Sequence, residues 1–232
     1  MTFILTNDDG IDAPGLHALL KAVNGKAILI APKQECSGCS HRVTTKEGIH
    51  VEKRSQTAYA VGGTPADCIR LAISHLCPDV KWVLSGINWG GNVGVDTYIS
   101  GTVAAVREAA FHGIPAIAIS HYRKGKLNVD WELAAHWAAI VLDELLSRPL
   151  APGSFWNVNL PHLLPGAPAP QIVFCPPSRQ PLPLKYRVEG EYFYYIGDYA
   201  SRERAPGTDV DVCFSGNIAV TQLRLESARF LL

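Results

Sequence analysis

The chain has 232 residues, which is enough for one α/β domain with a sizeable core and a small appendage. Lysine plus arginine equals aspartate plus glutamate at 21 each, so we expect no net attraction to nucleic acid or to acidic membranes. The sequence has no signal-peptide pattern and no apolar run of about 18 residues, which predicts a cytoplasmic protein without a membrane partner.

The first 160 residues alternate between strand and helix patterns. A strand, a helix and a second strand within about 30 residues form a βαβ unit, which predicts parallel pairing of the two strands. Repetition of this unit predicts an α/β fold of the Rossmann-like, three-layer αβα sandwich type. The expected strands cover residues 2–6, 26–31, two parts of 49–61, 82–84, 115–120 and 155–160, and the expected helices cover 15–23, 64–75, 100–111 and 131–146.

The composition changes after residue 160. Residues 161–183 hold eight of the 16 prolines, which predicts an irregular arm. Alternating patterns predict a β-hairpin at 186–199 and strand structure at 210–225. We therefore expect a Rossmann-like catalytic core at 1–160 and, at 161–232, a β-rich C-terminal arm with a hairpin and a closing strand.

The expected hairpin is rich in aromatic residues, with five of them between Tyr192 and Tyr199. An isolated two-stranded hairpin is marginally stable in water, so these rings need a surface to cover them. The proline-rich segment before the hairpin would hold it away from its own core, which favours exchange between two subunits. A hairpin folded back over its own sheet as a lid would bury the same rings and is the alternative.

Two adjacent carboxylates, Asp8 and Asp9, follow the first expected strand and are followed directly by Gly10. In an open α/β sheet, ligands bind at the carboxyl ends of the strands. Two neighbouring carboxylates repel each other and gain no packing there, which indicates that a cation lies between them. Asn-Asp-Asp-Gly is also good chemistry for a solvated turn. This segment alone supports a metal site and a plain turn about equally.

Two further strand ends carry polar loops, at 36–40 and at 85–94. Parallel strands bring these loops to the same edge as the two carboxylates, and the combined oxygen donors select magnesium, manganese or calcium over zinc or copper. Ser100, Gly101 and Thr102 open a helix, where free N–H groups and the helix dipole suit a phosphate. Serine and threonine are also ordinary helix caps, which is the alternative interpretation. The loop at 85–94 is also rich in glycine, but it lacks the sequence fingerprints of dinucleotide and nucleoside-triphosphate sites.

Cys36 and Cys39 form a C-x-x-C motif. Zinc would need a second cysteine pair at suitable spacing, and none follows. A thioredoxin-like pair usually opens a helix, whereas this motif lies in a loop rich in serine and glycine. The pattern favours two reduced loop thiols, and a thiol-redox protein that works without metal is the alternative.

Several short motifs occur in a fixed order along nearly the whole chain: Thr6-Asn7-Asp8-Asp9-Gly10-Ile11, Ala13-Pro14-Gly15, Ala31-Pro32, Ser37-Gly38, Gly63-Thr64-Pro65-Ala66-Asp67-Cys68, Ser85-Gly86-Ile87-Asn88, Asn92-Val93-Gly94, Ser100-Gly101-Thr102-Val103 and Gly207-Thr208-Asp209. Together they resemble the stationary-phase survival protein SurE family. The chain departs from the family pattern at the cysteines that flank Ser37. It also departs at Val95 and Ile99, where an acidic residue and a tyrosine are common.

The resemblance implies a divalent-metal-dependent phosphatase of the 5′-nucleotidase type, which acts on nucleoside monophosphates and, in several members, on short polyphosphate. The ligands it implies for one cation (Mg, Mn or Ca) are Asp8, Asp9, Ser37 and Asn88. The residues it implies for holding the phosphate are Asn92, Ser100, Gly101 and Thr102. Asp8 or Asp9 would position or deprotonate the attacking water, and direct attack by an aspartate stays open.

The resemblance also implies a homodimer or tetramer in which the C-terminal arm, about residues 161–199, reaches onto the neighbouring subunit. A nucleotide- or polyphosphate-binding module without turnover is the main alternative from another class. Such a module would keep the phosphate loops and lack a metal ligand, and no ligand is missing here.

Overall fold

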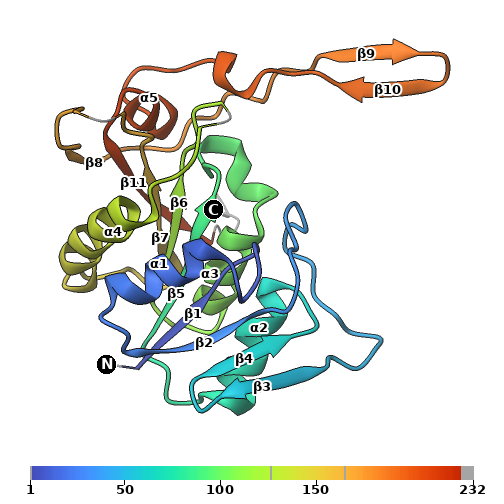
Figure 1. Cartoon of the computed structure of the whole chain (residues 1–232), viewed down its shortest axis with the longest axis vertical. Helices are drawn as coiled ribbons and strands as arrows, with labels where there is room; N and C mark the ends of the chain where they lie inside the picture. Colours follow the sequence, from blue (N-terminus) through green and yellow to red (C-terminus); the bar gives the residue numbers. More distant parts are fainter. Residues whose placement is uncertain (1, 126, 165, 226–232) are drawn as a thin grey trace, which may run out of the picture.

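The computed structural model describes residues 2–125, 127–164 and 166–225, which form a large sheet with helices on both faces (Figure 1). The strands are β1 (Phe3–Thr6), β2 (Ala27–Pro32), β3 (Val51–Ser55), β4 (Ala58–Val61), β5 (Trp82–Trp89), β6 (Ala116–His121), β7 (Ser154–Leu160), β8 (Ile172–Phe174), β9 (Tyr186–Glu189), β10 (Tyr192–Tyr195) and β11 (Ile218–Arg224). The helices are α1 (Pro14–Ala22), α2 (Pro65–Leu71), α3 (Gly101–Phe111), α4 (Trp131–Leu146) and α5 (Asp209–Phe214). Short helical turns are η1 (Ala72–Leu76), η2 (Gly94–Tyr98) and η3 (Tyr199–Ser201).

The large sheet contains nine strands in the order β3-β4-β2-β1-β5-β6-β7-β11-β8. Strands β4, β2, β1, β5, β6 and β7 are mutually parallel, as the βαβ pattern predicts, whereas β3 and β11 run antiparallel to their neighbours β4 and β7. The hairpin strands β9 and β10 form a second sheet of two strands. Strands β8 and β11 lie after residue 160, so this part of the chain contributes to the central sheet as well as to the arm.

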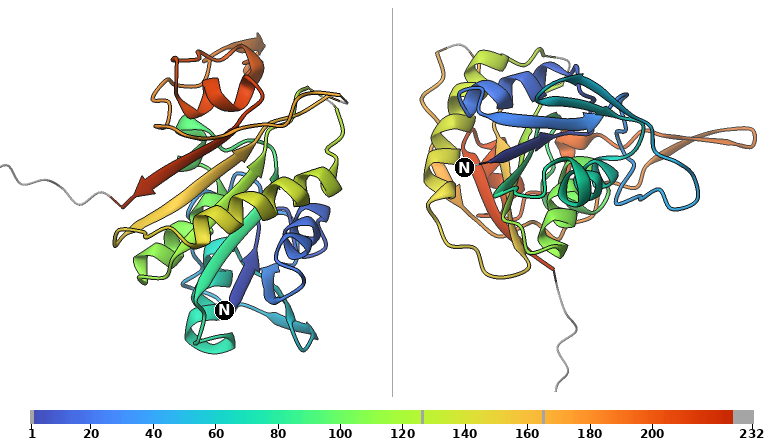
Figure 2. Two further views of the ribbon diagram at one scale, coloured as in Figure 1. Left: turned by 90° about the vertical axis from the view of Figure 1, so that its left-hand side faces the viewer. Right: turned by 90° about the horizontal axis from the view of Figure 1, so that it is seen from below.

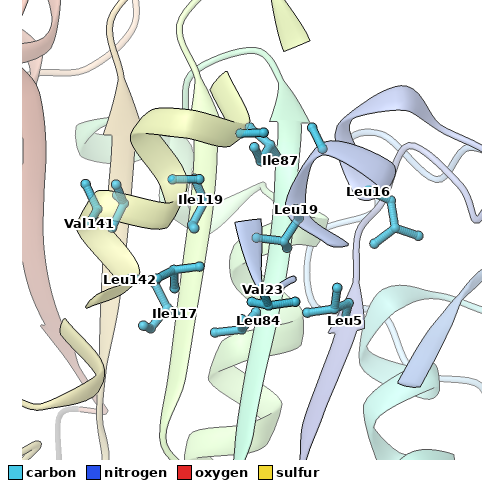
Figure 3. Close-up of a cluster of buried hydrophobic side chains, with 14 of the residues drawn as sticks. Leu5, Leu16, Leu19, Val23, Leu84, Ile87, Ile117, Ile119, Val141 and Leu142 are labelled. Carbon is cyan, nitrogen blue, oxygen red and sulfur yellow. The ribbon is translucent and has the colours of Figure 1, made fainter. Parts of the chain in front are cut away.

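Helices α1 and α4 cover one face of the sheet, and α2 and α3 cover the other, which confirms the predicted three-layer architecture (Figures 1 and 2). Successive strand residues alternate between the two layers. Leu5 and Leu84 pack with α1 and α4, whereas Ile4 and Val83 pack with α2 and α3. Figure 3 shows the first of these two cores, where aliphatic side chains from the strands and from α1 and α4 gather. Each fully buried aliphatic side chain contributes roughly 1.5–3 kcal/mol to folding.

Local sequence explains where the helices begin. At α2, the Thr64 hydroxyl accepts from the Asp67 N–H (3.2 Å), and the Thr64 N–H donates to the Asp67 carboxylate (3.0 Å). This reciprocal capping box, with Pro65 in the first helical position, confirms the predicted start. The helical structure continues from α2 into the π-helical turn η1, which ends at Leu76, so it matches the predicted range 64–75 to within a residue. Within the described ranges, no helix combines the length and apolar character needed to cross a membrane.

The expectation of strand structure at 210–225 is wrong for its first part, because residues 209–214 form α5 and only 218–224 form β11. Six residues are too few to separate a helical from a strand pattern. Tertiary contacts decide between them. Val210 and Cys213 are buried in a small cluster with Val93 and Tyr122, which lie beside the sheet edge.

The order of the strands places a crevice at the carboxyl ends of β1 and β5. After β1 the chain continues into α1 on one face, and after β5 it continues through η2 into α3 on the other face. Neighbouring parallel strands whose connections leave to opposite faces form a topological switch point, where ligands of α/β sheets bind. Asp8 and Asp9 follow β1, and Asn88 lies at the end of β5, so these predicted site residues meet at this crevice.

Candidate active site

The turn after β1 presents Asp8 and Asp9 at the sheet edge. The Asn7 side-chain nitrogen donates to the Gly10 carbonyl (2.8 Å), and the Asn7 side-chain oxygen accepts from the Gly10 N–H (3.2 Å). Gly10 has a φ of +106°, which disfavours a side chain at this position. The segment is therefore a well-formed turn, and this turn is what holds the two carboxylates in place.

Asp8 is buried against the start of α3. The Thr102 hydroxyl donates to the Asp8 carboxylate, and the N–H groups of Gly101 and Thr102 also stabilise its charge. Burial nevertheless raises the pKa of Asp8 above its ordinary value. A Cβ on Gly101 would lie 2.8 Å from the Asp8 Cβ and 3.0 Å from the Cys39 sulfur, so only glycine lets the helix approach this closely. Gly101 and Thr102, which the family resemblance assigns to the phosphate, thus contact Asp8.

Asp9 is held by a backbone group from the neighbouring strand. Its carboxylate accepts from the Trp89 N–H (3.1 Å) at the end of β5. Burial, and then the nearby charge of Asp8, raise the pKa of Asp9 to about 6, and Glu35 adds to the rise. Two adjacent carboxylates whose pKa values both rise are a sign of charge that a ligand compensates.

Neither carboxylate has a cationic partner in the described part of the chain. No ion pair there includes Asp8 or Asp9. In the same ranges, no cluster of three or more His, Cys, Asp or Glu side chains could hold a metal. A cation at this edge would therefore depend on two carboxylates, neutral oxygens and water. That donor set fits a hard cation such as magnesium, manganese or calcium, and it does not fit zinc.

The other two predicted ligands reach the same edge by different routes. The loop that carries Ser37 is joined to the site by the Cys36 N–H, which donates to the Asp8 carbonyl (2.7 Å). The exposed Ser37 hydroxyl donates to Glu35 (2.7 Å). The Asn88 side-chain nitrogen donates to the Gly90 carbonyl (2.8 Å), which leaves the amide oxygen on the opposite side of the group. Ligation by Ser37 and by Asn88 stays a prediction.

Asn92 lies in a buried network of amide groups that the sequence analysis missed. Its backbone N–H donates to the Asn159 side chain (2.7 Å), and its own side-chain nitrogen donates to the Ser120 hydroxyl (2.8 Å). The side chains of Asn157 (2.8 Å) and Asn159 (3.1 Å) donate to the Asn92 carbonyl. In the sequence, this network was signalled by Asn157 and Asn159, which occupy alternating positions of a largely apolar strand. The network fixes the loop that leads from β5 to α3.

Ser100 occupies the cap position of α3, and its hydroxyl accepts from the Val103 N–H (3.1 Å). The capping interpretation of this serine therefore holds in the structure. A role for Ser100 in holding phosphate stays a prediction, and in this geometry its backbone N–H is bonded to the Asp96 carbonyl (3.1 Å).

The C-terminal segment clamps the loop that leads into α3, and this clamp was also missed by the sequence analysis. Arg202 donates to the Asp96 carboxylate (2.7 Å), and the Tyr199 hydroxyl donates to the same oxygen (2.6 Å). Asp209 accepts from the backbone N–H groups of Gly94 (2.7 Å) and Ser178 (2.8 Å). The quoted motif Gly207-Thr208-Asp209 was a signal for Asp209, whereas Asp96 and Arg202 lie 106 residues apart in the sequence. We call Asp96, Tyr199, Arg202 and Asp209 the aspartate clamp.

Cys36 and Cys39 are both reduced and lie in the loop after β2. Burial raises the pKa of the Cys39 thiol to about 11 and also raises the pKa of Cys36. Redox-active thiols usually have lowered pKa values, since the thiolate is the reactive species. The local chemistry therefore favours structural thiols over the thiol-redox alternative.

A cavity of about 640 Å³ opens beside Asp9. It lies between the turn after β1, the start of the loop after β2, the end of β5 and the start of α4, and its wall includes Pro14, Glu35, Trp89 and Trp131. This volume falls in the range of small-molecule sites.

A Rossmann-like sheet with paired carboxylates and a helix start at its switch point is typical of α/β enzymes that act on phosphorylated ligands. The family model of survival protein SurE matches residues 3–181. A protein of Nostoc sp. named "Putative 5'-nucleotidase alr3139" is 66% identical, over 97% of this chain and 100% of that protein. The 5'-nucleotidase SurE of Paramagnetospirillum magneticum is 35% identical, over 96% of this chain and 89% of the relative.

The crystal structure of the SurE protein from Aquifex aeolicus has the same fold, with a TM-score of 0.87 and 28% sequence identity. The similarity covers 99% of this chain and 95% of that one. The chain belongs to the SurE family, which confirms the resemblance inferred from its motifs.

Proposed function

We propose that this protein is a divalent-metal-dependent 5′-nucleotidase, which hydrolyses nucleoside 5′-monophosphates to nucleosides and inorganic phosphate. The observation that carries the proposal is the pair Asp8 and Asp9, which lie at the switch point and have no ion-pair partner among the described residues. The names of the relatives support the same reaction. The donor chemistry supports Mg, Mn or Ca as the cation.

Asp8, Asp9, Ser37 and Asn88 would hold the cation, which when bound neutralises charge on a phosphoryl oxygen. Thr102 orients the Asp8 carboxylate through its hydroxyl. Asp8 or Asp9 would position the attacking water or accept its proton. Water then adds to phosphorus, the bond to the 5′ oxygen breaks, and that oxygen takes up a proton as the nucleoside leaves.

Asn92, Ser100, Gly101 and Thr102 would hold the phosphate in this reaction. The start of α3 contributes the positive end of a helix dipole close to the carboxylates. Asn92 is fixed by Ser120, Asn157 and Asn159, so little reorganisation is needed when charge develops on the phosphate.

Release of inorganic phosphate from 5′-AMP tests the proposal, with Mg, Mn or Ca added in separate assays and with a chelator as control. We expect turnover that the chelator abolishes and that one of the cations restores. The same panel should include 3′-AMP and tripolyphosphate, which tests whether the activity extends to 3′-nucleotides and short polyphosphate. Full activity in the chelator would contradict the metal mechanism, and binding of AMP without turnover under any cation would support a binding module instead.

The same proposal includes a cytoplasmic homodimer or tetramer joined through the C-terminal arm. The hairpin β9–β10 extends away from the central sheet (Figure 1), and its rings are open to solvent, with Tyr192 70% and Phe193 68% exposed. Such a hairpin needs a partner surface, and a second copy of this chain offers one by symmetric exchange. Light scattering at micromolar concentration should give a dimer or tetramer. A fully active monomer would contradict this part of the proposal.

A further inference from the structure

The cavity beside Asp9 has two indole rings in its wall. Trp89 comes from the end of β5, and Trp131 is the first residue of α4. The exposed charged residues Asp12, Lys33 and Glu35 also line it. A pocket with aromatic walls and a few polar groups is suited to a flat, partly polar ring system.

Trp89 connects this cavity to the candidate active site. Its backbone N–H donates to the Asp9 carboxylate (3.1 Å), while its side chain lines the cavity and remains 55% exposed. The Arg123 guanidinium lies over the indole, 4.5 Å from the ring centroid. A cation–π contact of this kind restrains the ring without burying it. A ligand stacked on this ring would therefore lie close to Asp9.

Trp131 forms a more rigid part of the wall. Its ring packs against the core between α1, α4 and the sheet. A Cβ added at Gly15 would lie 2.0 Å from the Ile87 carbonyl oxygen and 3.1 Å from the Trp131 ring, so the start of α1 packs closely against both β5 and this indole. The ring also approaches His121, with 6.5 Å between centroids. The ring is thus held from several sides and is preorganised for contact with a ligand.

We propose that this cavity is a nucleobase site, in which the base of the substrate stacks on Trp89 and contacts Trp131 while the phosphate lies at Asp9. The inference rests on the proposed nucleotidase function, and it explains how the enzyme would select nucleotides among phosphate esters. Stacking on an indole does not depend on which base is present, because each base has a π face. The site therefore favours nucleotides as a class over phosphate esters that lack an aromatic base.

The test compares kcat/KM for 5′-AMP with kcat/KM for ribose 5-phosphate, which carries the same phosphate and sugar without the base. We expect the wild type to prefer AMP. Trp89→Ala should lower the ratio of the two values by about tenfold to a hundredfold, and Trp89→Phe should recover most of it. Trp131→Leu, which keeps an apolar side chain, should lower the ratio by a smaller factor. Trp137→Phe is the matched control, because Trp137 also lies on α4 but does not line this cavity.

A binding measurement without turnover accompanies the kinetics. Adenosine, which has no phosphate, should quench tryptophan fluorescence in the presence of a chelator, and Trp89→Ala should lose this response. Melting curves confirm that each variant is folded, and the exposed position of Trp89 makes its replacement easy to tolerate.

Two outcomes would overturn the inference. One is equal preference for AMP and ribose 5-phosphate in the wild type, and the other is an unchanged ratio in folded Trp89→Ala. Both leave phosphomonoester hydrolysis itself intact. Absence of turnover on either ester with every cation would instead overturn the proposed function, and the adenosine titration would still report whether the base binds.

Discussion

Two groups of aspartates contact the segments that follow β1 and β5, and their surroundings differ. Asp96, in the aspartate clamp, is 5% exposed and is paired with Arg202 and bonded to the Tyr199 hydroxyl, whereas Asp209, at 0% exposure, is held by backbone N–H groups alone. Asp8 is also buried, at 4% exposure, yet it has hydrogen bonds and no ion-pair partner among the described residues. Asp9 has the Trp89 N–H and the like charge of Asp8.

Asp96 has a cationic partner, whereas Asp8 and Asp9 have none among the described residues, which supports the proposal that these two carboxylates bind a cation. A buried ion pair is strongly destabilised when one partner is removed, because the other charge is left without compensation. In the intact protein, Asp8 and Asp9 resemble such a pair after the cation has been removed, because their charges have no cationic partner among the described residues. Uncompensated charge in a crevice is costly to the fold and is retained where it binds something.

The largest effect should come from breaking the clamp. Arg202→Met leaves Asp96 buried without its cation, which should lower the free energy of unfolding by about 3–5 kcal/mol. Urea unfolding measures this change. The double variant Arg202→Met with Asp96→Asn should recover part of the loss, because it removes the orphaned charge. A loss below about 1 kcal/mol in the single variant would show that the clamp is not stabilising.

Asp9→Asn should have the opposite character, with a large loss of activity and little loss of stability. We expect phosphatase activity to fall on the order of 100-fold or more, because the amide neither balances a cation nor accepts a proton. Without added metal, the melting temperature should stay equal to the wild-type value or rise. A divalent cation should raise the melting temperature of the wild type and not that of the variant. Retained activity in Asp9→Asn would contradict the role assigned to this carboxylate.

A smaller effect is expected at the contact between Asp8 and α3. Thr102→Val removes the hydroxyl that donates to the Asp8 carboxylate and should lower kcat/KM by roughly tenfold, as expected for one lost hydrogen bond to a charged group. Ser100→Ala removes the helix cap and should cost about 1 kcal/mol of stability. Steady-state kinetics on both variants measure the contribution of the Asp8 orientation to activity, and melting curves measure the contribution of the helix cap to stability. Equal effects of the two changes on stability alone would assign both residues to the helix.

The last effect concerns pH. The pKa of Asp9 is raised from 3.8 to about 6 by burial and by Asp8, so the unfolded chain ionises this group first. Below pH 3.8 the carboxyl is protonated in both states and makes no difference. As the pH rises from 3.8 to 6, the wild type should lose stability relative to Asp9→Asn, and the difference should stay constant above pH 6. Urea unfolding of both proteins in a chelator measures it, and a difference that shrinks as the pH rises would contradict the burial of this charge.

Prediction from sequence succeeded where local patterns and short motifs carry the information. Apolar runs separated by helical segments predicted the parallel strands β1, β2, β5, β6 and β7, and Thr64-Pro65 predicted the start of α2. The short motifs, taken together in their order along the chain, predicted the family. Prediction from sequence failed at residues 209–214. These six residues fit both the helical and the strand period, and packing against Val93 and Tyr122 selects the helix.

The sequence by itself determined the class of fold, the family and the residue types available at the sheet edge, since these depend on short-range patterns and on motifs in order. Only the tertiary structure decided which of these groups meet. Asp96 finds Arg202 across 106 residues, and Asn92 finds Asn157 and Asn159 on a neighbouring part of the sheet. Trp89 and Trp131 come to line one cavity because β5 and α4 converge beside Asp9. Such contacts depend on strand order and on the packing of the layers, and spacing along the chain does not specify either of them.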